Sequence, residues 1–163
     1  DRICIYGGSF GGYAALMAPA REQGLYKCAV GYVGMYDAQL QYKLSDTGES
    51  ADGRRYLDRA FGATREEQDA MSPITYADQI KLPVMLAAGA RDRRCPPEHT
   101  EAMFEALERA GNRPEDMIIQ SGEMHGFYDV QNRVNLYTKM LAFIGSHIGG
   151  QVEVGNAERT ASR

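Results

Sequence analysis

Three residue types that together carry out acyl transfer occur in this 163-residue chain, each in a loop that follows an apolar run. Ser9 lies at the centre of a G-x-S-x-G pattern, residues 7–11 (GGSFG). A serine hydroxyl is a poor nucleophile at neutral pH, so it needs a neighbouring base and an acid group that holds this base. Asp92 and His125, later in the chain, are the candidates for these two roles.

The choice of base is limited because the chain has only three histidines. His99 opens a predicted helix, where we expect a surface residue. His147 lies in the last turn of another predicted helix, where a histidine suits the helix dipole. His125 alone follows a predicted strand and lies in a loop with glycines, so we predict that His125 is the base.

The acid and the mechanism follow from the order along the chain. Asp116 precedes its strand and Asp129 follows the histidine too closely, whereas Asp92 comes directly after a strongly apolar strand. Serine, aspartate and histidine in this order are typical of one large class of hydrolases. We expect Ser9 to attack an acyl carbonyl, and the backbone N–H of Phe10 to stabilise the oxyanion that forms.

The predicted elements place these residues at one edge of a sheet. Apolar runs predict strands at residues 3–6, 28–33, 83–89 and 116–120, with helices between them and a last helix that ends at 149. Alternating strands and helices predict an α/β fold with a parallel sheet covered on both faces. Chemistry in such sheets gathers at the carboxyl ends of the strands, where all three candidate residues lie.

Composition bounds the remaining possibilities. A net charge of −4 argues against nucleic-acid binding as the main role. The three cysteines show no C-x-x-C spacing, so we predict neither a disulfide framework nor a zinc site, and we expect Cys4 and Cys28 to act as small buried hydrophobic residues. Cys95 borders the expected active site. No metal or other cofactor is expected. Residues 1–150 read as one domain, and 151–163 as a polar, disordered tail.

Several motifs resemble those of the prolyl oligopeptidase family of serine peptidases, which includes dipeptidyl and acylaminoacyl peptidases. Residues 7–13 (GGSFGGY) are similar to its G-x-S-[YF]-G-G-[YF] turn, and residues 122–127 (GEMHGF) to its G-E-x-H-G-F loop. The segment before the aspartate also resembles the family, through Ser72-Pro73, Tyr76, Ile80, Pro83, Gly89, Asp92 and Pro96. The resemblance implies the C-terminal half of an α/β-hydrolase fold, with Ser9, Asp92 and His125 as its triad and short peptides as substrates.

The sequence also departs from the family pattern. Ala88 stands where the family usually has a histidine before the glycine, and Cys95 stands where a valine is common. The resemblance places Val33 and Tyr36 in the region of the pocket for the residue before the scissile bond, with plain packing as the alternative. The family's second oxyanion donor is a tyrosine upstream of the turn, which this sequence does not contain.

The start of the chain suggests a piece of a longer protein. The family's catalytic domain begins well before the serine turn, so the strand at 2–6 is expected to have an unpaired edge. We predict that the missing N-terminal segment of the same protein covers this edge, or that the chain self-associates through Arg2 to Tyr6. Two alternatives to the peptidase remain open: a carboxylesterase of the same fold, and a structural or assembly fragment without activity.

Overall fold

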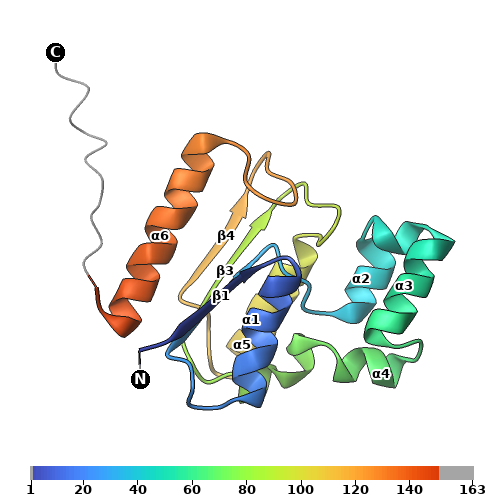
Figure 1. The fold of residues 1–163 in the computed structure, drawn as a ribbon, viewed down its shortest axis with the longest axis horizontal. Coiled ribbons are helices and arrows are strands. Elements are labelled where there is room, and N and C mark those ends of the chain that lie inside the picture. Colours follow the sequence, from blue (N-terminus) through green and yellow to red (C-terminus); the bar gives the residue numbers. More distant parts are fainter. Residues whose placement is uncertain (1, 151–163) are drawn as a thin grey trace.

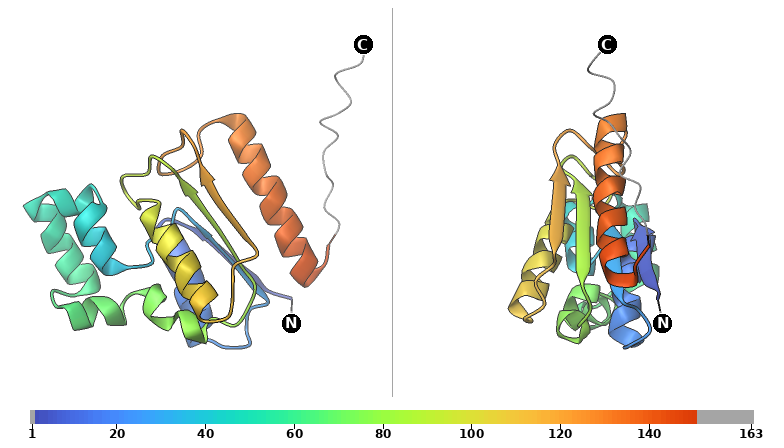
Figure 2. Two further views of the ribbon diagram at one scale, coloured as in Figure 1. Left: turned by 180° about the vertical axis from the view of Figure 1, so that it is seen from behind. Right: turned by 90° about the vertical axis from the view of Figure 1, so that its left-hand side faces the viewer.

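The computed structural model describes residues 2–150, so the predicted disordered tail at 151–163 lies outside the described residues. Its centre is a four-stranded parallel sheet in the order β1-β2-β3-β4. The strands are β1 (Cys4–Gly8), β2 (Cys28–Tyr32), β3 (Val84–Gly89) and β4 (Asp116–Gln120). The predicted parallel sheet is confirmed, and Figures 1 and 2 show the strands running side by side through the molecule.

Helices cover both faces of this sheet, because successive strand residues point to opposite sides. Helices α1 (Phe10–Arg21) and α5 (Glu98–Arg109) pack on the face that holds Ala29 and Leu86. Helix α6 (Val130–Ile148) packs on the other face, against Val30 and Met85. Strand β3 is buried along its whole length, which explains its uninterrupted apolar sequence.

A group of short helices connects β2 to β3. It comprises α2 (Ala38–Leu44), the 3₁₀ turn η1 (Thr47–Glu49), α3 (Ala51–Phe61), α4 (Arg65–Ala70) and the 3₁₀ segment η2 (Pro73–Gln79). Figure 1 shows α2, α3 and α4 gathered on the side of the molecule away from α6. Helix α4 begins with a capping box, in which Thr64 and Glu67 exchange hydrogen bonds. No helix within residues 2–150 has both the length and the apolar character needed to span a membrane.

The prediction that Cys4 and Cys28 are separate thiols is wrong, because the two form a disulfide across β1 and β2. Parallel pairing sets Cys4 directly opposite Cys28, with their Cα atoms 4.6 Å apart. This distance lies within the range that a disulfide requires. The register of two strands separated by a helix is a tertiary property, so the spacing of the cysteines in the sequence did not indicate the bond.

Candidate active site

Ser9 occupies a one-residue turn between β1, which ends at Gly8, and α1, which begins at Phe10. Its backbone has φ 58° and ψ −121°, a strained conformation for a residue with a side chain. The Ser9 N–H donates to the Tyr32 carbonyl at 2.9 Å, and the Ser9 carbonyl accepts from the Gly12 N–H at 2.9 Å. The turn is therefore held by β2 on one side and by the first turn of α1 on the other.

Glycines around Ser9 are required by close backbone contacts. A Cβ atom on Gly7 would overlap the backbone of Gly11, where the strand and the helix cross. A Cβ atom on Gly12 would lie 2.9 Å from the Cα atom of Gly34, in the loop after β2. The glycine pattern thus lets α1 approach β1 and β2 closely enough to place Ser9 at the end of the sheet.

Asp92 lies in the acid loop, residues 90–97, which follows β3. Its side chain is fully buried, and its Oδ1 accepts hydrogen bonds from the backbone N–H groups of Arg94 at 2.8 Å and Cys95 at 2.9 Å. The other oxygen, Oδ2, lies 2.8 Å from Nδ1 of His125. Because both oxygens are engaged, the carboxylate has a defined orientation toward the histidine.

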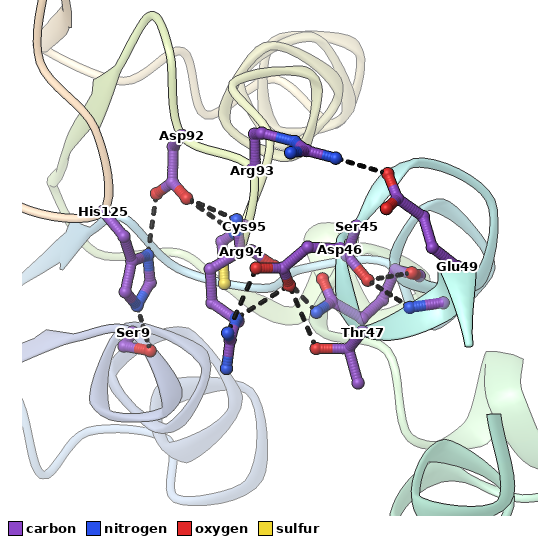
Figure 3. Close-up of polar contacts among 12 residues, drawn as sticks. Ser9, Ser45, Asp46, Thr47, Glu49, Asp92, Arg93, Arg94, Cys95 and His125 are labelled. Atoms are coloured by element: carbon purple, nitrogen blue, oxygen red, sulfur yellow. Dashed lines mark hydrogen bonds and ion pairs between the residues drawn. The ribbon is translucent and has the colours of Figure 1, made fainter. Parts of the chain in front are cut away.

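His125 connects Asp92 to Ser9 (Figure 3). Its Nε2 lies 2.8 Å from the Ser9 Oγ, while its Nδ1 faces Asp92. Since a carboxylate only accepts hydrogen bonds, we assign the proton to Nδ1, which leaves Nε2 free to accept from the serine hydroxyl. The structure thus brings the three residues that the sequence singled out into one continuous hydrogen-bonded chain, although 116 positions separate Ser9 from His125.

Glu123 anchors the histidine loop, residues 121–129, to the start of α6. Its buried carboxylate accepts from the backbone N–H groups of Tyr128 at 2.6 Å and Asp129 at 3.1 Å, and from the side-chain amide of Asn132 at 2.8 Å. The hydrogen bond from Asn132 contributes most to a lowered pKa of Glu123, and the backbone N–H groups add to this effect. They outweigh the loss of hydration, which by itself would raise the pKa. The carbonyl of Glu123 also accepts from the Arg91 N–H at 2.8 Å, so this loop is tied to the acid loop.

Phe10, the predicted oxyanion donor, is the first residue of α1. A backbone N–H at this position has no acceptor within its own helix. It also lies at the positive end of the helix dipole, and both effects favour an anion beside Ser9. The Phe10 side chain is 65% exposed and stacks on Tyr13 with ring centroids 5.2 Å apart.

A cavity of about 230 Å³ opens beside Ser9 and His125. Its lining includes Phe10, Met35, Gln41, Thr47, Tyr56, Leu57, Phe61, Arg94 and Cys95. Neither Val33 nor Tyr36 is among its lining residues, so for these two the alternative of plain packing fits the structure. Val33 is 3% exposed and has φ 43°, and Tyr36 is fully buried in the core under α1 and α5.

The wall of this cavity includes residues that sequence reasoning missed. Leu57 and Phe61 come from α3, in a polar stretch with few apolar repeats. Their spacing of four residues puts them on one face of α3, which was the only local signal for a buried face. Nothing in the sequence indicated that this face is turned toward Ser9.

The expectation that His99 lies on the surface is wrong, because His99 is fully buried. Its Nδ1 accepts from the backbone N–H groups of Tyr36 and Asp37, each at 3.3 Å, so its Nε2 carries the proton and donates to Gln41 Oε1 at 3.0 Å. Gln41 in turn donates to the carbonyl of Arg94 at 2.9 Å. Burial lowers the pKa of His99 to about 4, so the ring is neutral at neutral pH.

The other polar groups near the site form ion pairs rather than a metal centre. Arg94 donates to Asp46 through Nε at 2.8 Å, and Arg93 pairs with Glu49 at 2.7 Å (Figure 3). Within residues 2–150, no group of three or more His, Cys, Asp or Glu side chains is arranged to hold a metal ion. The site therefore places a serine hydroxyl, a histidine ring and a buried carboxylate beside an open cavity.

Comparison with known proteins identifies the family that this chain resembles. Residues 1–151 match the family model described as the prolyl oligopeptidase family. The chain is 29% identical over 168 residues to dipeptidyl aminopeptidase BIII of Pseudoxanthomonas mexicana, covering 99% of this chain and 24% of that protein.

Solved structures show the same relationship. The acylaminoacyl peptidase of Pyrococcus horikoshii superposes with a TM-score of 0.78 at 24% identity, over 94% of this chain and 25% of that one. A puromycin-hydrolyzing peptidase of Mycobacterium tuberculosis superposes with a TM-score of 0.76 at 28% identity, over 90% of this chain and 22% of that one. The chain thus spans about a quarter of the length of these relatives, and its four strands and flanking helices correspond to part of an α/β-hydrolase fold. The chain belongs to the prolyl oligopeptidase family of serine peptidases.

Proposed function

We propose that this chain carries the catalytic triad of a serine peptidase that cleaves peptide bonds of short peptides. The observation that carries the proposal is the continuous hydrogen-bonded chain from Ser9 through His125 to Asp92, with both links at 2.8 Å. The names of the relatives support peptide bonds as the target, since they are called a dipeptidyl aminopeptidase and an acylaminoacyl peptidase.

In the proposed reaction, the Ser9 Oγ attacks the carbonyl carbon while its proton passes to Nε2 of His125. Asp92 stabilises the imidazolium that results, and the Phe10 N–H donates to the oxyanion. Nε2 then gives its proton to the leaving amine as the C–N bond breaks, which leaves an acyl-serine. Water, deprotonated by His125, attacks the acyl-serine and releases the acid and the free serine.

A fluorophosphonate probe tests the proposal, because it reacts only with an activated serine. We expect the native protein to be labelled, labelling to be lost in Ser9→Ala, and labelling to persist in the control Ser121→Ala, which removes an exposed hydroxyl from the histidine loop. A native protein that stays unlabelled would contradict the proposal and favour the inert fragment. If labelling occurs, comparing hydrolysis of matched ester and amide substrates separates the peptidase from the carboxylesterase.

A further inference from the structure

A second cavity, of about 440 Å³, also borders His125. Its other lining residues come from the acid loop, the histidine loop and the turn between α2 and η1, and they are Asp46, Arg91, Arg93, Arg94, Met124 and Tyr128. We call this space the basic cavity. Its volume lies within the range of about 300–1,000 Å³ that is typical of small-ligand sites. Neither Ser9 nor Phe10 lines it, so it is distinct from the cavity beside the serine.

The charged groups of the basic cavity do not balance. Three arginines line it together with one carboxylate, that of Asp46. Arg94 donates to Asp46 through Nε at 2.8 Å and through Nη2 at 3.1 Å. Arg93 donates to Glu49 at 2.7 Å (Figure 3). Within residues 2–150 the Arg91 guanidinium has neither an ion-pair nor a hydrogen-bond partner, so Arg91 is free to bind an anion.

The backbone of Arg91 is fixed against the histidine loop. Its N–H donates to the Glu123 carbonyl at 2.8 Å. Gly89 permits this close approach, because a Cβ atom on Gly89 would overlap the carbonyl of Met124. The Arg91 side chain itself is exposed. It therefore extends from a defined position beside His125, and it can bind a ligand without breaking an ion pair.

Two side chains of the histidine loop add apolar surface to the basic cavity. Met124 is 53% exposed and Tyr128 is 66% exposed. The Tyr128 ring lies 3.9 Å from the place that a Cβ atom on Gly126 would occupy, so the ring is next to the backbone that follows His125. The cavity thus combines a free guanidinium with apolar side chains, which suits a residue that has both a side chain and a carboxylate.

The position of this cavity indicates which part of a substrate it holds. In the proposed reaction Ser9 bonds to the acyl carbon, so the acyl fragment lies against Ser9 and the Phe10 N–H. His125 gives its proton to the nitrogen of the leaving fragment, which therefore departs beside the histidine ring. Because the basic cavity borders His125 but neither Ser9 nor Phe10, it fits the leaving fragment.

We propose that the basic cavity binds the leaving fragment and that Arg91 pairs with its C-terminal carboxylate. A guanidinium presents two parallel N–H groups that match the two oxygens of a carboxylate. A compact space of this volume is about 8 Å across and an extended residue spans about 3.5 Å, so the carboxylate reaches Arg91 when about one or two residues follow the scissile bond. The assignment rests on the proposed function, because a leaving fragment forms only if Ser9 is acylated.

Peptides that differ only in their terminal charge test this assignment. Three pools of pentapeptides, built from neutral residues in mixed order, are compared: one with a free C-terminal acid, one with a C-terminal amide, and one with the amide and a glutamate as first residue. Mass spectrometry identifies the products. We expect bonds that lie one or two residues from the C-terminus to be cleaved roughly tenfold faster in the acid pool than in either amide pool.

Variants of Arg91 show whether the preference arises in this cavity. Arg91→Gln should bring the acid pool down to the rate of the amide pool, and Arg91→Lys should keep part of the preference, because it retains the charge but not the paired N–H groups. The matched control Arg113→Gln removes the same charge at a 71% exposed position before β4, at the opposite end of the sheet, and should keep the full preference.

Two outcomes of the pool experiment would overturn the assignment. Equal rates for the acid and amide pools would show that no carboxylate is bound on the leaving side. A faster rate for the pool that begins with glutamate, lost in Arg91→Gln, would place the carboxylate in the acyl fragment instead.

A binding measurement does not depend on the reactivity of Ser9. Isothermal titration calorimetry on Ser9→Ala compares the dipeptide Ala-Phe, a leaving fragment, with its C-terminal amide. We expect Ala-Phe to bind roughly tenfold more tightly than the amide, and this difference to vanish in Ser9→Ala/Arg91→Gln. Equal binding of the two would overturn the assignment even if the fluorophosphonate labels Ser9. Tighter binding of the acid without fluorophosphonate labelling of the native protein would keep the carboxylate site and reject the proposed function.

Discussion

At the scale of single residues, the site depends on polar groups whose orientation is set by their hydrogen-bond partners. Asp92 has both oxygens engaged, and His125 thereby keeps one nitrogen for Ser9. His99 is a fully buried histidine that is not part of the hydrogen-bonded chain from Ser9 to Asp92. Its neutral ring orients Gln41, which holds the carbonyl of Arg94 two residues after the acid. A proton on Nδ1 of His99 would break the two backbone hydrogen bonds that it accepts.

We predict that His99 makes stability depend on pH between about 4 and 6.5, the lowered pKa of the buried ring and its ordinary value. Between these two pH values, His99 binds a proton in the unfolded chain but stays neutral in the folded protein. The stability contributed by a neutral His99 is therefore complete above pH 6.5 and is lost as the pH falls toward 4. The loss is on the order of 3 kcal/mol, since one pKa unit corresponds to about 1.4 kcal/mol.

Urea unfolding at a series of pH values measures this effect. His99→Gln should be less stable than the native protein at pH 7, and the difference should shrink as the pH falls to 4. The control Gln131→Ala changes an exposed, uncharged side chain near the start of α6, and it should keep the native pH dependence. An unchanged difference between native protein and His99→Gln at pH 7 and pH 4 would contradict the prediction.

At the scale of elements, the segment formed by α2 and η1 holds the acid loop from outside the sheet. The Asp46 N–H donates to the Arg93 carbonyl at 2.7 Å, and Gln41 donates to the Arg94 carbonyl at 2.9 Å. The exposed ion pair between Arg93 and Glu49 spans the same boundary. Buried hydrogen bonds and exposed ion pairs contribute differently to the free energy of unfolding. Removing one partner of a buried hydrogen bond leaves the other partner desolvated and unpaired, whereas an exposed ion pair is screened by water and contributes little.

We predict that Gln41→Met destabilises the fold by about 1–3 kcal/mol, because it leaves the Arg94 carbonyl and the His99 N–H without partners. Glu49→Gln, which removes a charge at the same boundary from a side chain that is 63% exposed, should cost less than about 1 kcal/mol. Urea unfolding at pH 7 compares the two variants. Equal losses would show that the buried amide does not hold the acid loop.

We also predict that the bond between Cys4 and Cys28 stabilises the pairing of β1 with β2. A disulfide that closes a loop across 24 positions lowers the entropy of the unfolded chain, which stabilises the folded protein by about 3 kcal/mol. Dithiothreitol should therefore lower the urea midpoint of the native protein and leave that of Cys4→Ser/Cys28→Ser unchanged. A thiol assay on unreduced, unfolded protein should find one free thiol, Cys95. Three free thiols would mean that the bond is absent.

At the scale of the whole molecule, Ser9 directly follows β1, a strand at the edge of the described sheet. Strand β1 pairs with β2 on one side, and Ile3 and Tyr6 are 45% and 43% exposed. Apolar side chains on an open strand edge favour pairing with another strand. The dipeptidyl aminopeptidase and the acylaminoacyl peptidase named above are about four times longer than this chain. We propose that the strand edge at Arg2 to Tyr6 contacts either a preceding segment of a longer protein or a second copy of the chain.

We predict that this 163-residue chain self-associates in solution through β1. Sedimentation velocity should show a mean mass that rises with protein concentration, and Ile3→Lys/Tyr6→Lys should return the protein to a monomer, because lysines on an edge strand oppose pairing. Leu25→Lys is the control, since it places a lysine on a side chain that is 48% exposed in the turn after α1. A native protein that stays monomeric at all concentrations would contradict the prediction.

Local patterns were enough to predict the sheet and the three residues at its edge. The strand at 116–120 was predicted with the bounds that the structure has, and the turn around Ser9 follows from glycines that the backbone contacts require. These features depend on residues that are close together in the chain. Steric contacts between neighbours determine the turn, and the local pattern of apolar residues determines the strands and helices. In a parallel sheet, the residues that directly follow the strands all lie at the carboxyl edge of the sheet, so the order of strands and helices is enough to place them there.

The sequence by itself thus determined the elements, the parallel sheet and the positions of Ser9, Asp92 and His125. Only the tertiary structure decided that Cys4 pairs with Cys28, that His99 is buried, and that α3 rather than Val33 and Tyr36 lines the cavity. Each of these depends on how distant segments pack, through strand register in one case and through the placement of a helical segment in the others. Such packing is set by many weak contacts across the whole chain, and no local pattern encodes it.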